Sequence, residues 1–175
     1  AFGAATMTRH VEPGFLDSGE ALLTETIAQL RSLLFQLAPP DFTQDRIGAA
    51  LHQRAQRILP SGTRIDLEDR VSKSIDEDTG RALFRIGQEA ITNVAKHAQA
   101  HAVRIVLAED PTGVILEIID DGVGADATRF ERHALGHLGV SGMIERARQL
   151  GGRCEIDSTL GAGTTVRVRL PRPGV

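Results

Sequence analysis

The sequence is poor in cysteine, in long apolar runs and in net charge, and each shortage excludes a class of protein. The single cysteine, Cys154, cannot form a disulfide within the chain, which fits a reducing compartment. No apolar run is long enough to span a bilayer, and the start AFGAATMTRHVEPG lacks the charged and apolar regions of a signal peptide. A formal net charge of -3 gives no electrostatic reason to bind nucleic acid or anionic lipid. We therefore expect a cytoplasmic chain without a nucleic-acid partner, and the sequence leaves open whether its parent protein is anchored in a membrane.

Glycine is abundant, and it is unevenly placed. Ten of the 18 glycines lie between Gly113 and Gly163. Packing alone does not explain this concentration, because glycine is favoured where the backbone takes a positive φ or comes close to a ligand. A chain of 175 residues is long enough for one compact domain with a short appendage. We therefore look for one binding site, in the second half of the chain.

The region before residue 41 differs in pattern from the rest. Apolar residues between Leu16 and Leu37 recur at steps of seven, four, three, four and three, the heptad pattern of a helix that packs against other helices. Pro39 and Pro40 end this helix, because proline lacks the helical N–H donor. We divide the chain into a disordered leader over residues 1–14, one bundle helix over 15–40 and a main domain over 41–175. The missing initiator methionine indicates a fragment of a longer protein.

The main domain alternates helical and strand patterns. Helices are expected from Ile47 to Leu59, from Glu77 to Ala98 and from Gly139 to Leu150, and strands at TRIDLED, VRIVLAE, GVILEIID, RCEIDST and TTVRVRLP. Residues 110–113 suit a tight turn, and Gly151 suits a helix C-cap. This order predicts an α/β fold, an α+β two-layer sandwich. Its mixed, mainly antiparallel sheet of about five strands would be covered on one face by three helices.

One face of the helix expected over 77–98 is polar. Arg85, Glu89, Asn93 and His97 follow one another at i, i+4 spacing and form a single row. The row is either a solvated face or a ligand site. Asn is unfavourable in the middle of an exposed helix, and an amide oxygen one turn from a carboxylate suits Mg²⁺, which prefers oxygen ligands. The row by itself leaves both interpretations open.

The strand GVILEIID ends in two aspartates that alternation separates. Asp120 shares a face with Val114, Leu116 and Ile118, so it is expected to point under the helices. A buried carboxylate is costly unless it is hydrogen-bonded. A ligand amine such as the 6-amino group of adenine would supply that bond. Alternatively, Asp120 only caps the following turn.

Three glycine-rich segments follow Asp120. Gly122 and Gly124 in DDGVG are weak evidence alone, because loops need glycine. Gly139 and Gly142 lie at the start of a helix, where free N–H groups and the helix dipole favour an anion such as phosphate. GAGTT, taken alone, is a hairpin turn.

In this order the segments resemble the nucleotide-binding motifs of the GHKL ATPases, above all sensor histidine kinases of the NarL/UhpB-like group. RIGQEAITNVAKHAQA resembles the N box, and DDGVG, GHLGVSGMIERARQLGG and GAGTTVRVRLP resemble the three glycine boxes. LRSLLFQLAPPDF resembles the leucine-rich helix before the ATP-binding domain. The resemblance extends from Leu16 to Pro171 and implies a Bergerat-type ATP-binding fold.

The resemblance also implies roles for individual residues. Asn93 would bind Mg²⁺, Glu89 would act at the metal as the catalytic carboxylate, and Asp120 would accept the adenine amine. Val140 stands where the group usually has Leu, and residues 125–141 would form a lid over the nucleotide. The complete set of implied ATP-binding residues is Glu89, Asn93, Lys96, His97, Asp120, Gly122, Gly124, His137, Gly139, Val140, Gly142, and Thr164 or Thr165 at the base end.

The function implied is that of the catalytic domain of a two-component sensor histidine kinase. It would bind Mg²⁺ and ATP and pass the γ-phosphate to a histidine on a helical bundle, for relay to a response regulator. Residues 15–40 would be the second helix of that bundle and the contact of a homodimer. His10 does not suit the acceptor, because Pro13 and Gly14 prevent a continuing helix. The alternatives are a nucleotide-binding regulatory module that transfers no phosphate and a serine kinase of the anti-sigma-factor type.

Overall fold

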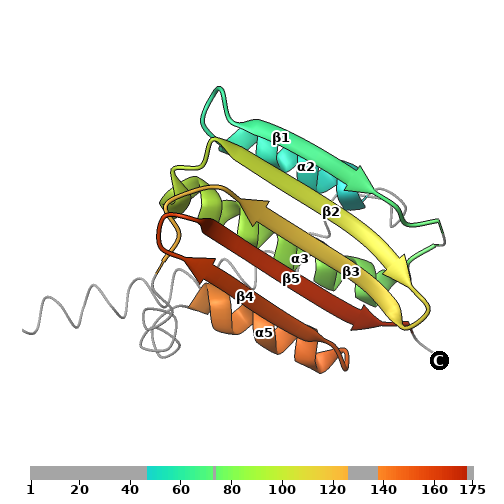
Figure 1. Cartoon of the computed structure of the whole chain (residues 1–175). Helices are drawn as coiled ribbons and strands as arrows, with labels where there is room; N and C mark the ends of the chain where they lie inside the picture. Colours follow the sequence, from blue (N-terminus) through green and yellow to red (C-terminus); the bar gives the residue numbers. More distant parts are fainter. Residues whose placement is uncertain (1–46, 73, 126–137, 173–175) are drawn as a thin grey trace, which may run out of the picture. The chain divides into compact units, whose positions relative to one another are not determined.

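The structure, a computed structural model, describes residues 47–72, 74–125 and 138–172 (Figure 1). The chain divides into two units, residues 1–41 and 42–175, and all the described residues belong to the second. The leader and bundle helix expected before residue 41 lie outside the described residues. So do residues 126–137 of the expected lid, including His137.

The main domain contains a sheet with the strand order β1-β2-β3-β5-β4. Its strands are β1 (Arg64–Asp69), β2 (Ala102–Asp110), β3 (Gly113–Asp120), β4 (Arg153–Thr159) and β5 (Gly163–Pro171). β1 is parallel to β2, and the other three pairings are antiparallel. The predicted mixed, mainly antiparallel sheet of five strands is confirmed.

The helices cover one face of this sheet (Figure 1). They are α2 (Ile47–Ile58), α3 (Glu77–Asn93) with its π-helical continuation η2 (Val94–Ala98), and α5 (Leu138–Gln149). Apolar side chains of all these helices and of strands β2, β3 and β5 form one core. The predicted two-layer sandwich is confirmed. Within the described residues, no helix is both long and apolar enough to cross a membrane.

The residues of β3 alternate between a buried and a more exposed face, as the sequence predicted. Val114, Leu116 and Ile118 are buried in the core, and Asp120 continues the same face. The opposite face bears charged pairs such as Glu117 with Arg167, whose Oε1 and Nε atoms lie 2.6 Å apart. The helices therefore cover the apolar face, and Asp120 ends that face at one edge of the core.

α3 begins and ends at clear signals. The Asp76 side chain accepts a hydrogen bond from the Thr79 N–H at 3.0 Å, which caps the first turn. The last turn widens into the π-helix η2, and Gln99 follows in the left-handed region with a φ of 52°. The sequence predicted one regular helix to Ala98, whereas the structure contains a π-helical turn of the kind often found at functional sites.

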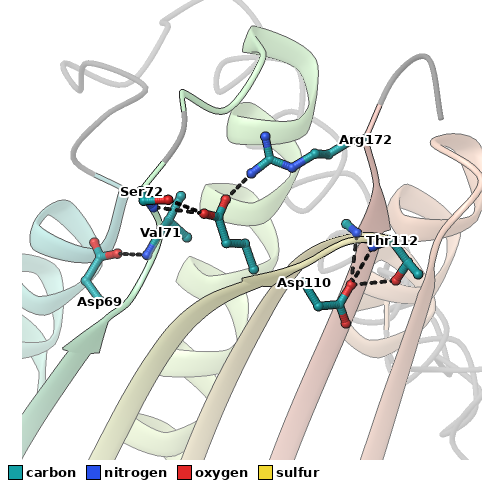
Figure 2. A network of polar contacts seen from close by, with 8 residues as sticks. Asp69, Val71, Ser72, Asp110, Thr112 and Arg172 are labelled. Atoms are coloured by element: carbon teal, nitrogen blue, oxygen red, sulfur yellow. Dashed lines mark hydrogen bonds and ion pairs between the residues drawn. The ribbon is translucent and has the colours of Figure 1, made fainter.

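The β2–β3 turn lies at the end of β3 opposite to Asp120 (Figure 2). Oδ1 of Asp110 accepts hydrogen bonds from the Thr112 N–H and hydroxyl at 2.8 and 2.6 Å, as expected for a tight turn. Next to it, Glu109 accepts from Ser72 and pairs with Arg172. These contacts connect the end of β2 to the loop after β1 and to the chain after β5. At this end of the sheet, the polar side chains therefore form hydrogen bonds and ion pairs with one another.

Candidate functional site

A cavity of about 500 Å³ lies where the end of α3 and η2, the start of α5 and the inner face of β3, β4 and β5 meet. Most of the residues that the sequence singled out line it. They are Glu89, Asn93, Lys96, His97, Asp120, Gly124, Gly139, Val140 and Thr164. Segments that are far apart in the sequence therefore share one cavity, as the order of the motifs predicted.

The other expected residues within the described ranges are absent from the lining. Thr165 is not on the lining, because successive strand residues face opposite sides and Thr164 takes the inner one. Gly122 and Gly142 also do not line the cavity. Of the two threonines that the sequence left open, Thr164 lines the cavity, and the ATP-binding roles expected for Gly122 and Gly142 stay predictions.

The helical wall of the cavity is polar. Glu89, Asn93 and His97 come from successive turns of α3 and η2, and Lys96, three residues after Asn93, lies on the same side. Arg85, the first residue of the polar row, is not on the lining. The pKa of Arg85 is lowered by partial burial and then by the positive charges of Arg146 and Arg81. The side chains of Glu89 and Asn93, whose oxygens are possible metal ligands, thus line the same cavity.

Asp120 lies at the opposite wall, on the sheet, and is only 6% exposed. Its Oδ1 accepts a hydrogen bond from the Gly122 N–H at 2.9 Å, so it does cap the following turn as the simpler alternative held. Burial raises the pKa of the carboxyl, and hydrogen bonds from the Gly122 and Thr164 N–H groups oppose that rise. Asp120 therefore has both expected properties, a turn contact and a place on the cavity wall.

The glycines of DDGVG are required by the protein's own backbone. A Cβ atom on Gly122 would lie 2.2 Å from the Ala98 carbonyl oxygen, which accepts the Val123 N–H at 2.8 Å. Gly124 has a φ of 61°, and a Cβ atom there would lie 2.0 Å from the Thr159 carbonyl oxygen. Gly122 thus lets the loop lie against the end of η2, which explains its glycine without a ligand.

Gly139 has a different neighbour. A Cβ atom on it would lie 2.2 Å from Oε1 of Glu89, so the start of α5 lies directly against this carboxylate. At Gly142 the nearest atom would be Nη1 of Arg146 at 3.5 Å, which is ordinary contact. Gly139 is therefore the glycine of α5 that leaves room for the Glu89 side chain on the cavity wall.

The sequence reasoning missed the apolar part of the cavity lining and the role of Asp121, which follows Asp120 but is not on the lining. Ile118, Val123, Met143, Ile156 and Val166 form the apolar part of the lining. Alternation alone would have found Ile118 and Val166, which share faces with Asp120 and Thr164. Asp121, whose Oδ1 accepts the His101 and Ala102 N–H groups at 2.8 Å each, fixes the loop after η2. Those hydrogen bonds, the Ala102 one first, lower the pKa of Asp121.

A family model described as histidine kinase-, DNA gyrase B-, and HSP90-like ATPase matches residues 78–174. The chain belongs to this ATPase family. The match begins in α3 and includes every element that lines the cavity. The family resemblance found in the sequence motifs is thereby confirmed.

Curated relatives of this ATPase-family chain are sensor kinases. An uncharacterized sensor-like histidine kinase of Chloroflexus aurantiacus is 33% identical over 89% of this chain and 27% of its own length. The Bacillus subtilis sensor histidine kinases YhcY and ComP are 31% and 32% identical over 89% and 81% of this chain, and over 40% and 18% of their own lengths. The chain thus spans less than half the length of each of these proteins.

Solved structures of the same fold include an ATP binding domain and a histidine kinase domain. The ATP binding domain of PrrB from Mycobacterium tuberculosis has a TM-score of 0.60 at 23% identity, over 75% of this chain and 94% of that one. The histidine kinase domain of a blue-light activated kinase from Erythrobacter litoralis has a TM-score of 0.60 at 18% identity, over 79% and 68%. At these identities the likeness shows the fold, which agrees with the sandwich described above.

Proposed function

We propose that this chain is the ATP-binding catalytic domain of a two-component sensor histidine kinase. It binds ATP with Mg²⁺ and transfers the γ-phosphate to a histidine on a helical bundle outside this chain, for relay to a response regulator. The observation that supports this most is the placement of a few polar side chains on two walls of a largely apolar cavity. An almost buried carboxylate, Asp120, lies on the sheet wall, and Glu89, Asn93, Lys96 and His97 lie on the helical wall.

Each wall suits one part of ATP. Asp120 is an acceptor beside apolar residues such as Ile118 and Val166, which suits the amine edge of a flat base. Lys96 and His97 place nitrogen donors at the helical wall, which suits phosphate oxygens. Glu89, close to Asn93, would orient or take the proton of the attacking group. Intact Glu89 favours transfer over a binding module that transfers nothing.

The donor set fits Mg²⁺. Asn93 offers an amide oxygen and Glu89 a carboxylate one turn away, both on the cavity lining. Mg²⁺ usually takes one or two protein oxygens and completes its shell with phosphates and water. Asn93 would hold the ion, with Glu89 beside it, and the bound ion would neutralise phosphate charge during transfer. We therefore expect weak Mg²⁺ binding without nucleotide.

The relatives support a wider proposal about the parent protein. Residues 15–40 would belong to the dimerising bundle of a homodimer, and residues 41–175 would be the catalytic domain. The parent would present both to the cytoplasm. The division of the chain into units of residues 1–41 and 42–175 supports these bounds, and the curated relatives, named as sensor or sensor-like histidine kinases, support the kind of parent protein.

Calorimetric titration tests the proposal. ATP with Mg²⁺ should bind more tightly than GTP by roughly ten- to a hundredfold, because the GTP carbonyl would face Asp120 with two acceptors and no donor. Asn93→Ala should weaken ATP binding with Mg²⁺ much more than in EDTA. Gln88→Ala, a change on the same helix away from the cavity lining, serves as the control. Equal affinities for ATP and GTP would refute the role of Asp120, and an equal loss in EDTA would remove Asn93 from the metal.

A further inference from the structure

The hydroxyl of Ser158, near the end of β4, contacts three polar groups. It accepts a hydrogen bond from the Ala125 N–H at 2.9 Å and lies 3.1 Å from the Gly163 carbonyl oxygen. It also lies 3.0 Å from the Thr164 hydroxyl, its partner across the β4–β5 pair. Ala125 directly follows the first glycine segment, and Gly163 and Thr164 belong to the third, so one half-buried side chain joins these two parts of the chain.

The number of hydroxyl hydrogens determines which group donates in each of the three contacts of Ser158. A serine hydroxyl has one hydrogen to donate, and a carbonyl oxygen only accepts. If the Ser158 hydrogen goes to the Gly163 carbonyl, the remaining contact is a hydrogen bond only when Thr164 donates to Ser158. This is the one arrangement in which all three contacts are hydrogen bonds at once. The Thr164 hydroxyl then has only lone pairs left for the cavity.

Thr164 stands directly beside Asp120. The two residues are register partners on β5 and β3, and both line the cavity. With its hydrogen held by Ser158, the Thr164 hydroxyl is an acceptor next to the Asp120 carboxylate. The base end of the cavity therefore offers two neighbouring acceptors to a ligand.

We infer that Ser158 is a positioning residue for base selectivity, which holds the Thr164 hydroxyl as an acceptor so that the cavity prefers a base with an amine over one with a carbonyl. This inference rests on the proposed function, because it concerns the base end of the same cavity. A purely structural role for Ser158 would weaken binding of all nucleotides alike. The inference instead requires a change in selectivity.

The test compares ATP with inosine triphosphate, whose base has a carbonyl in place of the amine, by calorimetry on the 175-residue chain. Ser158→Ala frees the Thr164 hydroxyl to turn and donate to that carbonyl. The ratio of ATP to inosine triphosphate affinity should fall about three- to tenfold, the worth of one hydrogen bond. Thr159→Ala, at the exposed neighbour, should leave the ratio unchanged. Ser158→Thr, which keeps a hydroxyl, should restore it.

A second set of variants separates selectivity from folding. With Thr164→Val as the starting protein, Ser158→Ala should no longer alter the ratio, because its effect passes through the Thr164 hydroxyl. Ser158→Cys keeps the shape with a weak hydrogen-bonding group, and it should lower the ratio even if Ser158→Ala does not fold. An unchanged ratio in folded Ser158→Ala or Ser158→Cys protein would overturn the inference, and so would an equal loss with and without the Thr164→Val change. Failure of the wild-type chain to bind ATP would instead overturn the proposed function.

Discussion

At the scale of single residues, Asp120 combines a place on the cavity wall with a cost in stability. It is 6% exposed, and burial raises its pKa despite the hydrogen bond from Gly122. A raised folded-state pKa means that the folded chain binds the proton more readily than the unfolded chain does. The Asp120 carboxylate therefore lowers the free energy of unfolding at neutral pH. This cost disappears as the pH falls below about 4, the pKa of an unperturbed aspartate.

Asp120→Asn should weaken ATP binding and stabilise the free protein. Asn keeps an oxygen that accepts the Gly122 N–H, but it removes the buried charge. We expect ATP affinity to fall about tenfold, because hydrogen bonds to charged groups are stronger than neutral ones. The thermal midpoint without nucleotide should rise at about pH 7, and the gain over wild type should shrink toward about pH 4. A variant with lower stability at neutral pH would contradict the assigned cost.

At the scale of elements, the site depends on how α5 lies against α3. Figure 1 shows the two helices side by side on the same face of the sheet. One point of contact is Gly139, where a Cβ atom would lie 2.2 Å from Oε1 of Glu89. That oxygen is the far end of a flexible side chain, so a methyl group there would displace the carboxylate without separating the helices.

Gly139→Ala should therefore reduce catalysis without unfolding the chain. Alanine favours helix over glycine by about 1 kcal/mol, which offsets the cost of moving Glu89. We expect ATP turnover to fall at least about tenfold, the rate equivalent of about 1.4 kcal/mol, while the thermal midpoint stays near that of wild type. Gly142→Ala, with ordinary contact at 3.5 Å, provides the stability control and should raise the midpoint.

A double variant shows whether Gly139→Ala acts through Glu89. If Gly139→Ala acts by displacing Glu89, adding it to Glu89→Gln should cause no further loss of turnover. Additive losses would mean that Gly139 acts on another part of the site.

At the scale of the whole molecule, we predict that this chain binds ATP but does not phosphorylate itself on histidine. His10 precedes Pro13 and Gly14, which exclude a continuing acceptor helix, and His97 lies on the cavity lining. With radiolabelled ATP, the chain should gain no acid-labile, base-stable label. Adding a helical segment of the parent protein that contains the acceptor should restore labelling, and Asn93→Ala should abolish it. Stoichiometric phosphohistidine on the 175-residue chain alone would contradict this prediction.

The local pattern of the sequence determined the element order, the turn at Asp110 and the inward face of Asp120. Each of these depends on a few neighbouring residues. Alternation along β3 alone places Asp120 on the apolar face, and the Asp110 side chain bonds to groups two and three residues away. The glycine motifs, taken in order, also predicted that distant segments share one cavity.

Tertiary structure alone decided which atoms meet. The register of β5 on β3 puts Thr164 beside Asp120, the approach of the DDGVG loop to Ala98 explains Gly122, and the position of α5 brings Gly139 against Glu89. The Ser158 hydroxyl joins groups that no spacing in the sequence relates. A local pattern fixes the face on which a side chain lies, whereas its partners depend on how whole strands and helices pack. That packing minimises the free energy of the entire core and cannot be calculated from any one segment.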